Sequence, residues 1–237
     1  MTDRLYFRQL LAGVDFAVGD PVATQMVNFI YAVGDRETGD AVLVDPAYRT
    51  RELLEALEDD DMTLRGIVLT HYHADHAGGT LAGHHIEGTR ELLGLRDVPV
   101  HVQSAESQWV SEGSGVGSSN LVEHDSGDSI AVGSVGVTLI HTPGHTPGSQ
   151  CVLVDGRLIS GDTLFIDGCG RTDLPGSDPV EMYRSLTSRL ADLDGSTWLY
   201  PGHRYAAAPT AQLDEVRRGN AVLAPMSAEQ WLAAFSR

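Results

Sequence analysis

Four side chains that commonly bind metal ions lie within the six residues 71–76. They are His71, His73, Asp75 and His76, and their imidazole and carboxylate groups suit zinc, iron and manganese. The apolar run 67–69 directly precedes them and predicts a short buried strand. Because α/β proteins commonly place their chemistry where strands end, we interpret this segment as a metal site. A solvated histidine-rich loop is the alternative.

The spacing of these residues allows more than one ion. Alternate side chains of a strand share a face, so His71 and His73 can point in the same direction. Asp75 and His76 follow the strand end and can reach a second ion a few ångströms away.

Three further metal-binding residue types also follow strand-like runs. His145 lies in the Pro- and Gly-rich segment 141–148 after the apolar run 137–140, and these residues favour a tight turn. Asp162 follows Gly161, which allows a close approach of the backbone. His203 follows the Pro-Gly pair 201–202. Each residue alone would more often be a hydrogen-bonded structural residue, but four strand-terminal clusters together favour a metal centre.

The composition predicts a cytoplasmic protein with a single domain. A chain of 237 residues can form one domain with a substantial core, which we assign to residues 1–237. The net charge of −17 repels phosphate backbones and anionic membranes, so we expect neither nucleic acid nor membrane as a partner. The two cysteines form no Cys-x-x-Cys pair, and the sequence begins without a signal-peptide pattern. Both observations fit a reducing, cytoplasmic location.

Strand and helix patterns alternate along most of the chain. We expect a mobile loop over residues 113–119 and assign no role to the N-terminal extension 1–25. Ser104, Asp178 and Ser227 are expected to cap helices, and Trp231, Leu232 and Phe235 to be buried. The expected strands cover residues 27–33, 41–46, 64–70, 98–102, 128–132, 135–141, 150–154, 158–160 and 197–200. The expected helices cover 50–57, 88–95, 104–112, 178–193, 209–218 and a segment from 227.

The combined motif resembles the metallo-β-lactamase superfamily, whose pattern is His-x-His-x-Asp-His followed by His, Asp and His. The resemblance runs from about Asn28 to Tyr205 and implies an α/β fold, the four-layered αββα sandwich, with metals at one edge of the sheets. It implies that His71, His73 and His145 bind one ion, that Asp75, His76 and His203 bind a second, and that Asp162 bridges the two. The resemblance favours His145 over the nearby His141. It leaves His84, His85, His101 and His124 as surface or structural residues.

Two families within the superfamily share further motifs with this chain. The segments 161–165 and 202–205 resemble glyoxalase II, or hydroxyacylglutathione hydrolase, and this resemblance implies hydrolysis of a thioester with two divalent ions, zinc by first expectation. A hydroxide bridging the ions would attack the carbonyl carbon, with Asp75 accepting its hydrogen bond. The region after His203 is shorter than the glutathione-binding region of glyoxalase II, so a smaller thioester or another thiol carrier is an equal expectation.

The segments 168–173 and 141–148 resemble the persulfide dioxygenases instead. That resemblance implies a single Fe²⁺ held by His73, His145 and Asp162, with a thiol-derived persulfide as substrate. The motifs 161–165 and 202–205 rank the hydrolase first and the dioxygenase second. A third interpretation, a binding module that a metal stabilises without catalysis, is disfavoured because structural zinc sites normally close with four ligands.

Contacts with the substrate are less specified by the sequence than the metal ligands. Arg171 and Tyr205 are candidates for contacting an anionic substrate, and a structural salt bridge or hydrogen bond is the alternative for each. A homodimer is compatible with the sequence, although no pattern argues for it.

Overall fold

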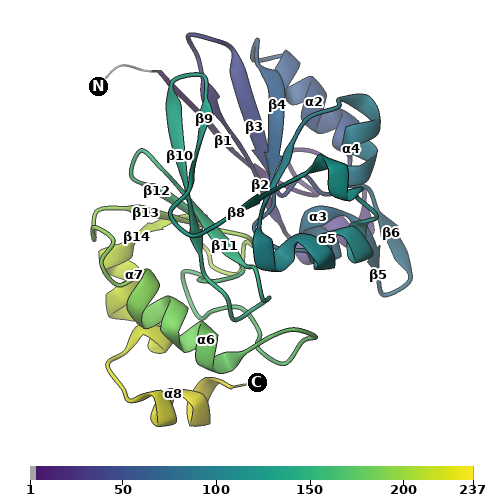
Figure 1. Cartoon of the computed structure of the whole chain (residues 1–237). Helices are drawn as coiled ribbons and strands as arrows, with labels where there is room; N and C mark the ends of the chain where they lie inside the picture. Colours follow the sequence, from purple (N-terminus) through teal and green to yellow (C-terminus); the bar gives the residue numbers. More distant parts are fainter. Residues whose placement is uncertain (1–3, 237) are drawn as a thin grey trace.

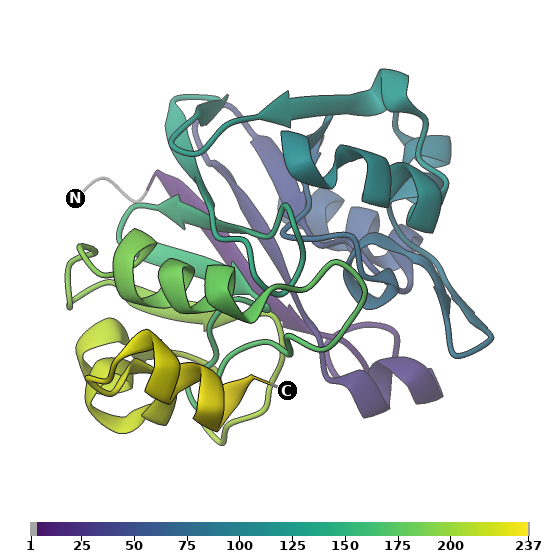
Figure 2. The ribbon, with the colours of Figure 1, turned by 60° about the horizontal axis from the view of Figure 1, so that its bottom comes forward.

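Two six-stranded sheets pack face to face in this computed structural model, which describes residues 4–236 (Figure 1). Helices cover both outer faces of the pair (Figure 2). Of the N-terminal extension 1–25, residues 1–3 lie outside the described residues. The αββα arrangement that the motif implies is confirmed.

The first sheet combines an antiparallel and a parallel half. Its strands β1 to β3 are antiparallel, and β3, β4, β7 and β8 run parallel to one another. Every residue of β2 is buried, because a strand covered on both faces needs apolar side chains on both. In spatial order the strands are β1 (Leu5–Leu11), β2 (Phe29–Asp35), β3 (Asp40–Val44), β4 (Thr63–Val68), β7 (Val100–Gln103) and β8 (Leu121–His124).

The second sheet is antiparallel except for one neighbouring pair, β12 and β13, which run parallel. A short hairpin of β5 (Gly79–Leu81) and β6 (His84–Ile86) lies outside both large sheets. In spatial order the strands of the second sheet are β14 (Ala211–Gln212), β13 (Trp198–Pro201), β12 (Arg157–Gly161), β11 (Gln150–Val154), β10 (Val135–His141) and β9 (Ser129–Val132).

Eight α-helices are present within residues 4–236, and most lie on the outer faces of the sheets. Asp178 and Ser227 accept hydrogen bonds from the first backbone N–H groups of α6 and α8, so both predicted caps are confirmed. The helices are α1 (Pro21–Met26), α2 (Thr50–Glu58), α3 (Ala74–Ala77), α4 (Thr89–Leu95), α5 (Ser107–Ser114), α6 (Pro179–Arg184), α7 (Leu213–Gly219) and α8 (Ala228–Phe235).

Three apolar cores separate the four layers. The first lies between α2, α4 and α5 and the first sheet, the second lies between the two sheets, and the third lies between the second sheet and α6 to α8. Trp231 of α8 is fully buried in the third core as expected, whereas Leu232 and Phe235 are only partly buried there. Among the described residues, no helix is long and apolar enough to span a membrane.

Several predicted elements differ from the structure. Ser104 opens a 3₁₀ turn, Ser104–Glu106, and its hydroxyl donates to the carbonyl of His124 instead of capping a helix. Helix α5 therefore starts later and includes Gly113 and Ser114, which were expected in a loop.

Three other boundaries shift in the structure. The strand expected from Val27 starts at Phe29, because Val27 ends α1 in a left-handed conformation with φ of 50°. The helix expected over 178–193 gives way to a π turn at Ser185–Arg189. The helix expected over 209–218 is β14 followed by α7.

Backbone hydrogen bonds join the two sheets at the end where the metal-binding motifs gather. Gln150 N–H donates to the carbonyl of Thr70 over 2.8 Å, and Phe29 N–H donates to the carbonyl of Gly202 over 2.8 Å. At another junction between the sheets, the Asp35 carboxylate accepts from the Ser134 N–H over 2.7 Å. The sandwich is thus connected through its main chain beside the site.

Candidate metal centre

All seven sequence-predicted ligand residues meet at one end of the sandwich. Each follows the end of a β-strand, and the short helix α3 turns Asp75 and His76 back toward the site. Strand β4 leads to His71 and His73, β10 leads to the turn with His145, β12 ends before Asp162, and β13 ends shortly before His203.

The seven side chains form two groups that share Asp162. The ligand atoms of His71, His73 and His145 lie within 4.8 Å of one another, and so do those of Asp75, His76 and His203. Asp162 lies between the groups: its Oδ2 is 3.6 Å from His145 Nε2, and its Oδ1 is 3.4 Å from His203 Nε2. This arrangement could hold two ions with one shared carboxylate.

Two buried atoms among these residues lack a hydrogen-bond partner. They are His71 Nε2 and Asp162 Oδ1. A buried polar atom without a partner costs about 1–3 kcal/mol, and such atoms are rare in native proteins. A cation in the first group would satisfy His71 Nε2 and one in the second group would satisfy Asp162 Oδ1, and histidine with carboxylate is a donor set that suits zinc or iron. The residues present therefore fit a metal centre.

The outward nitrogen of four ligand rings is held by a hydrogen bond. Such contacts fix the ring orientation and leave the other nitrogen facing the centre. The pairs are His71 Nδ1 with Thr70 Oγ1 at 3.0 Å, His76 Nδ1 with Asp45 Oδ2 at 2.9 Å, His145 Nδ1 with the Arg171 carbonyl at 2.8 Å, and His203 Nδ1 with the Met26 carbonyl at 2.7 Å. His73 differs, because its Nδ1 faces the centre, 2.9 Å from His145 Nε2.

The two groups differ in charge. Burial lowers the pKa of His71 well below its usual value and that of His73 to about 4, so both rings are neutral and can donate a lone pair. For His76, burial lowers the pKa, but the carboxylates of Asp75 and Asp162 outweigh it and raise the pKa to about 10. The second group therefore attracts positive charge, as a site for a cation should.

Two glycines allow the backbone to approach the shared carboxylate. A Cβ at Gly202 would lie 2.5 Å from Asp162 Oδ1. A Cβ at Gly161 would overlap Thr70 Oγ1, and its φ of +48° is a conformation that side chains disfavour. Larger residues at either position would displace Asp162 or the strand end beside His71.

The centre opens into a cleft of about 800 Å³. Both predicted substrate contacts, Arg171 and Tyr205, line it. The Tyr205 ring stacks on the His203 ring at 4.7 Å with a 4° angle between the planes, and Arg171 makes a bidentate ion pair with Asp173. The other lining residues are Met26, Tyr72, His73, Ala74, Asp75, Thr80, Leu81, Gly113, His145, Asp162, Phe165, Asp167, Cys169, Gly170, Leu174, Pro175 and His203.

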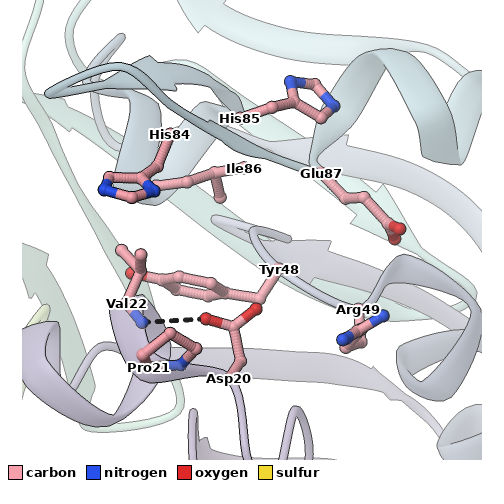
Figure 3. A pocket seen from close by; sticks show the side chains of 9 residues that line it. All are labelled: Asp20, Pro21, Val22, Tyr48, Arg49, His84, His85, Ile86 and Glu87. Carbon is pink, nitrogen blue, oxygen red and sulfur yellow. Dashed lines mark hydrogen bonds between the residues drawn. The ribbon is translucent and has the colours of Figure 1, made fainter.

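The five other histidines, none of which was predicted to bind metal, lie outside the two ligand groups. His141 Nε2 donates to the Pro147 carbonyl over 2.9 Å, and His101 and His124 pair with each other over 2.9 Å. His84 and His85 are exposed and line a separate pocket of about 290 Å³ next to Tyr48 (Figure 3).

Sequence reasoning missed three residues that support the centre. Asp45 accepts from His76 and from Thr70, and Asn28 Nδ2 donates to Asp75 Oδ2 over 3.1 Å. The Tyr48 hydroxyl, which belongs to the wall of the smaller pocket, donates to Asn28 Oδ1 over 2.7 Å. Asp45 lies at the C-terminal end of the strand predicted over 41–46 and directly follows the observed β3, a position similar to that of Asp162. Asn28 and Tyr48 carry no comparable signal.

Glu106 is a further buried residue beside the centre that the sequence did not single out. Its carboxylate accepts hydrogen bonds from Tyr72 N–H, Thr146 Oγ1 and Gly148 N–H at 2.8, 2.8 and 2.6 Å. Burial raises the pKa of Glu106 to about 7, although these three donors oppose the shift. Glu106 thus connects the segment of His71 and His73 to the turn of His145.

Comparison with known proteins agrees with this geometry. The family model described as the metallo-beta-lactamase superfamily matches residues 24–203. Among solved structures, ETHE1 from Myxococcus xanthus superposes with a TM-score of 0.75 at 29% sequence identity. That alignment covers 96% of this chain and 88% of the other.

Two curated relatives carry the two activities that the motifs imply. A hydroxyacylglutathione hydrolase from Shewanella loihica is 32% identical over 208 residues, which are 86% of this chain and 72% of the relative. The mitochondrial persulfide dioxygenase ETHE1 from Bos taurus is 30% identical over 213 residues, which are 88% of this chain and 76% of the relative. Similarity at this level does not separate the two activities.

Proposed function

This chain belongs to the metallo-beta-lactamase superfamily, and on that basis we propose that it is a metal-dependent hydrolase that cleaves a thioester with two bound divalent ions. The observation that carries the proposal is the pair of preformed ligand groups joined by Asp162. In this proposal His71, His73 and His145 hold one ion, Asp75, His76 and His203 hold the other, and Asp162 contacts both. The hydroxyacylglutathione hydrolase relative supports the reaction class.

Two divalent ions at this centre, zinc by first expectation, would supply a hydroxide near neutral pH and polarise the thioester carbonyl. The residues of the chain orient the reactants. Asn28 donates to one oxygen of Asp75 and thereby fixes the carboxylate, whose other oxygen can accept a hydrogen bond from the attacking water. Neighbouring His76 and His203 outweigh the effect of burial and lower the pKa of Asp75, so it stays ionised in that role. A thiolate is a good leaving group, so the reaction needs no strong general acid.

The second candidate is a persulfide dioxygenase with one Fe²⁺ on His73, His145 and Asp162. The specific observation in its favour is the close approach of these three side chains. His145 Nε2 is 2.9 Å from His73 Nδ1 and 3.6 Å from Asp162 Oδ2, a two-histidine, one-carboxylate set that suits non-haem iron. The bovine relative supports this candidate. The hydrolase ranks first because Asp75, His76 and His203 then hold an ion of their own.

Metal content measured together with activity tests the proposal. The protein is purified without added metal, analysed for its elements, and assayed both for thiol release from thioesters and for oxygen uptake with glutathione persulfide. The hydrolase predicts about two zinc ions per chain and thiol release. One iron ion with oxygen uptake and no thioester hydrolysis would overturn it in favour of the dioxygenase.

The variant Asp75→Asn sharpens this test, with Asp167→Asn in the same cleft as a matched control. Asp75 belongs to the second ligand group, whereas Asp167 lines the cleft outside both groups. If two ions act together, Asp75→Asn should retain about one ion per chain and lose most hydrolysis, while Asp167→Asn should keep both ions. Full turnover in Asp75→Asn would contradict the two-ion scheme.

The remaining expectations are proposals of the same kind. We propose a small-molecule partner and no nucleic acid, since the net charge of −17 repels polyanions. A cytoplasmic location and a homodimer stay predictions, and light scattering of the purified protein measures the second.

A further inference from the structure

The cleft beside the metal centre is mainly apolar and lacks a free cation among its described lining residues. We infer that it binds an uncharged thioester with an extended apolar group, in preference to one whose thiol carrier bears carboxylates or phosphates. This inference rests on the proposed thioester hydrolysis and specifies its substrate class.

Fixed aromatic and aliphatic side chains form the cleft walls. The Tyr72 hydroxyl donates to the Pro175 carbonyl over 3.0 Å, and the Tyr72 ring stacks on Trp109 with 5.0 Å between centroids. Both contacts hold the ring in place. Leu174 and Pro175 lie beside it in the lining. This part of the cleft offers a rigid apolar surface without a charged group.

A second apolar part adjoins the ligand His203. Phe165 and Tyr205 contact each other edge to face with 5.1 Å between ring centroids, and Tyr205 is 59% exposed although it stacks on His203. Met26 and Leu81 complete the apolar lining. Exposed aromatic surface at the mouth of a cleft commonly marks a ligand contact.

The charges of the lining disfavour an anionic ligand. Arg171 is the one lysine or arginine among the described lining residues, and its Nε and Nη2 each donate to Asp173 over 2.9 Å. Asp167 adds an acidic group that belongs to neither ligand group. A carrier with carboxylates would have to compete with Asp173 for Arg171 and approach a chain of net charge −17. An uncharged carrier meets neither obstacle.

The size of the cleft indicates more than a short acyl group. Its volume of about 800 Å³ lies within the range of pockets that enclose drug-sized ligands. Each buried methylene contributes enough apolar transfer free energy for roughly a fourfold gain in kcat/KM until the cleft is filled. Longer apolar acyl groups should therefore be better substrates than acetyl.

The test compares thioesters that share an acyl group and differ in the charge of the thiol carrier. The zinc-loaded protein is assayed for thiol release from S-hexanoyl-N-acetylcysteamine, which is uncharged, and from S-hexanoylglutathione, which carries two carboxylates. We expect kcat/KM for the uncharged ester to exceed that for the glutathione ester by about tenfold or more. We also expect the acetyl ester of N-acetylcysteamine to be far slower than the hexanoyl ester. Equal or higher kcat/KM for the glutathione ester overturns the inference and leaves the proposed hydrolase standing.

The variant Asp173→Asn tests the role of charge within the cleft. It releases Arg171 and should raise kcat/KM for the glutathione ester several-fold, while that for the uncharged ester stays unchanged. Asp155→Asn is the matched control, because Asp155 pairs with Arg157 on the exposed surface outside the cleft. An equal effect of Asp173→Asn on both esters would contradict the assigned role of Arg171.

Binding separates this inference from the proposed function. If no thioester is hydrolysed, the proposed function fails, but the cleft can still be examined with two thioethers that cannot be hydrolysed. Calorimetry on the metal-loaded protein with S-hexyl-N-acetylcysteamine and S-hexylglutathione should show about tenfold tighter binding of the uncharged compound. Equal or tighter binding of the glutathione compound overturns the inference independently of turnover.

Discussion

Glu106 connects two segments that carry metal ligands, and its substitution by glutamine should weaken both the fold and the metal centre. The residue is 1% exposed. One carboxylate oxygen accepts from the backbone N–H of Tyr72, which lies between His71 and His73, and from the hydroxyl of Thr146, next to His145. The other oxygen accepts from the N–H of Gly148. All three partners are donors, so the site requires two acceptor oxygens.

Glutamine has nearly the same shape as glutamate but supplies only one acceptor oxygen. If that oxygen keeps the bonds to Tyr72 and Thr146, the amide NH₂ faces the N–H of Gly148, and a buried donor is left without an acceptor. An unsatisfied buried donor costs about 1–3 kcal/mol. Residues that support metal ligands commonly change affinity by 10- to 100-fold when substituted. We expect Glu106→Gln to lose stability in this range and to bind metal at least tenfold more weakly.

Two measurements check this expectation at pH 8, above the pKa of about 7 to which burial raises Glu106. Urea unfolding of the metal-loaded protein gives the change in unfolding free energy, and competition with a chelator gives the metal affinity. Glu112→Gln on the exposed side of α5 is the control and should change the unfolding free energy by less than about 0.5 kcal/mol. Unchanged stability and affinity in Glu106→Gln would refute the reasoning.

Three further substitutions test other parts of the structure. Asp45→Asn replaces an acceptor of His76 and Thr70, so it should weaken metal binding by about 10- to 100-fold in chelator competition; wild-type affinity would contradict this role. Asp162→Ala removes the shared carboxylate, and His73→Ala removes a candidate ligand of the first ion. Each should abolish activity in the thiol-release assay, and a variant with full turnover would refute the site assignment. A hydrogen bond from Arg4 holds the pKa of Asp35 at about 2, below its usual 3.8, so Asp35 stabilises the fold above pH 4 and this contribution is lost as the pH falls toward 2. Asp35→Asn should therefore flatten the acid loss of stability between about pH 4 and pH 2, and an unchanged acid unfolding curve would show that Asp35 does not contribute.

The seven candidate ligand residues could be found from the sequence because the physical rule behind them is local. An apolar run followed by a His or Asp and a glycine or proline marks a strand end, and ends of neighbouring strands meet at one edge of a sheet. The rule identified His145, Asp162 and His203, and the cluster at 71–76 fits it as well. It applies equally to Asp45, but one acidic residue before a proline is a weak signal until β3 and β4 are known to run side by side.

Other features depend on contacts that no local pattern reveals. Asn28 precedes β2, Asp75 follows β4, and the two residues meet only because these strands lie in one sheet with β3 between them. The segment Leu5–Leu11 mixes polar and apolar residues and becomes a strand by pairing with β2 along its whole length. Helix α6 ends early although its apolar spacing continues, and in the π turn that follows, Ser185 donates to the Pro143 carbonyl.

The main-chain bonds between the sheets also bear on how the protein opens. The amides of Phe29 and Gln150 hydrogen-bond across the sandwich next to the ligands, so neither can exchange with solvent while the sheets stay together. We therefore expect local opening near the centre to require separation of the two sheets, an event close to unfolding of the whole chain. The metal centre and the sandwich therefore form one cooperative unit, and slow hydrogen exchange at the amides of Phe29 and Gln150 should report global unfolding. Substitutions that alter substrate preference are then expected in the loops around the cleft, because changes there leave the cooperative unit intact.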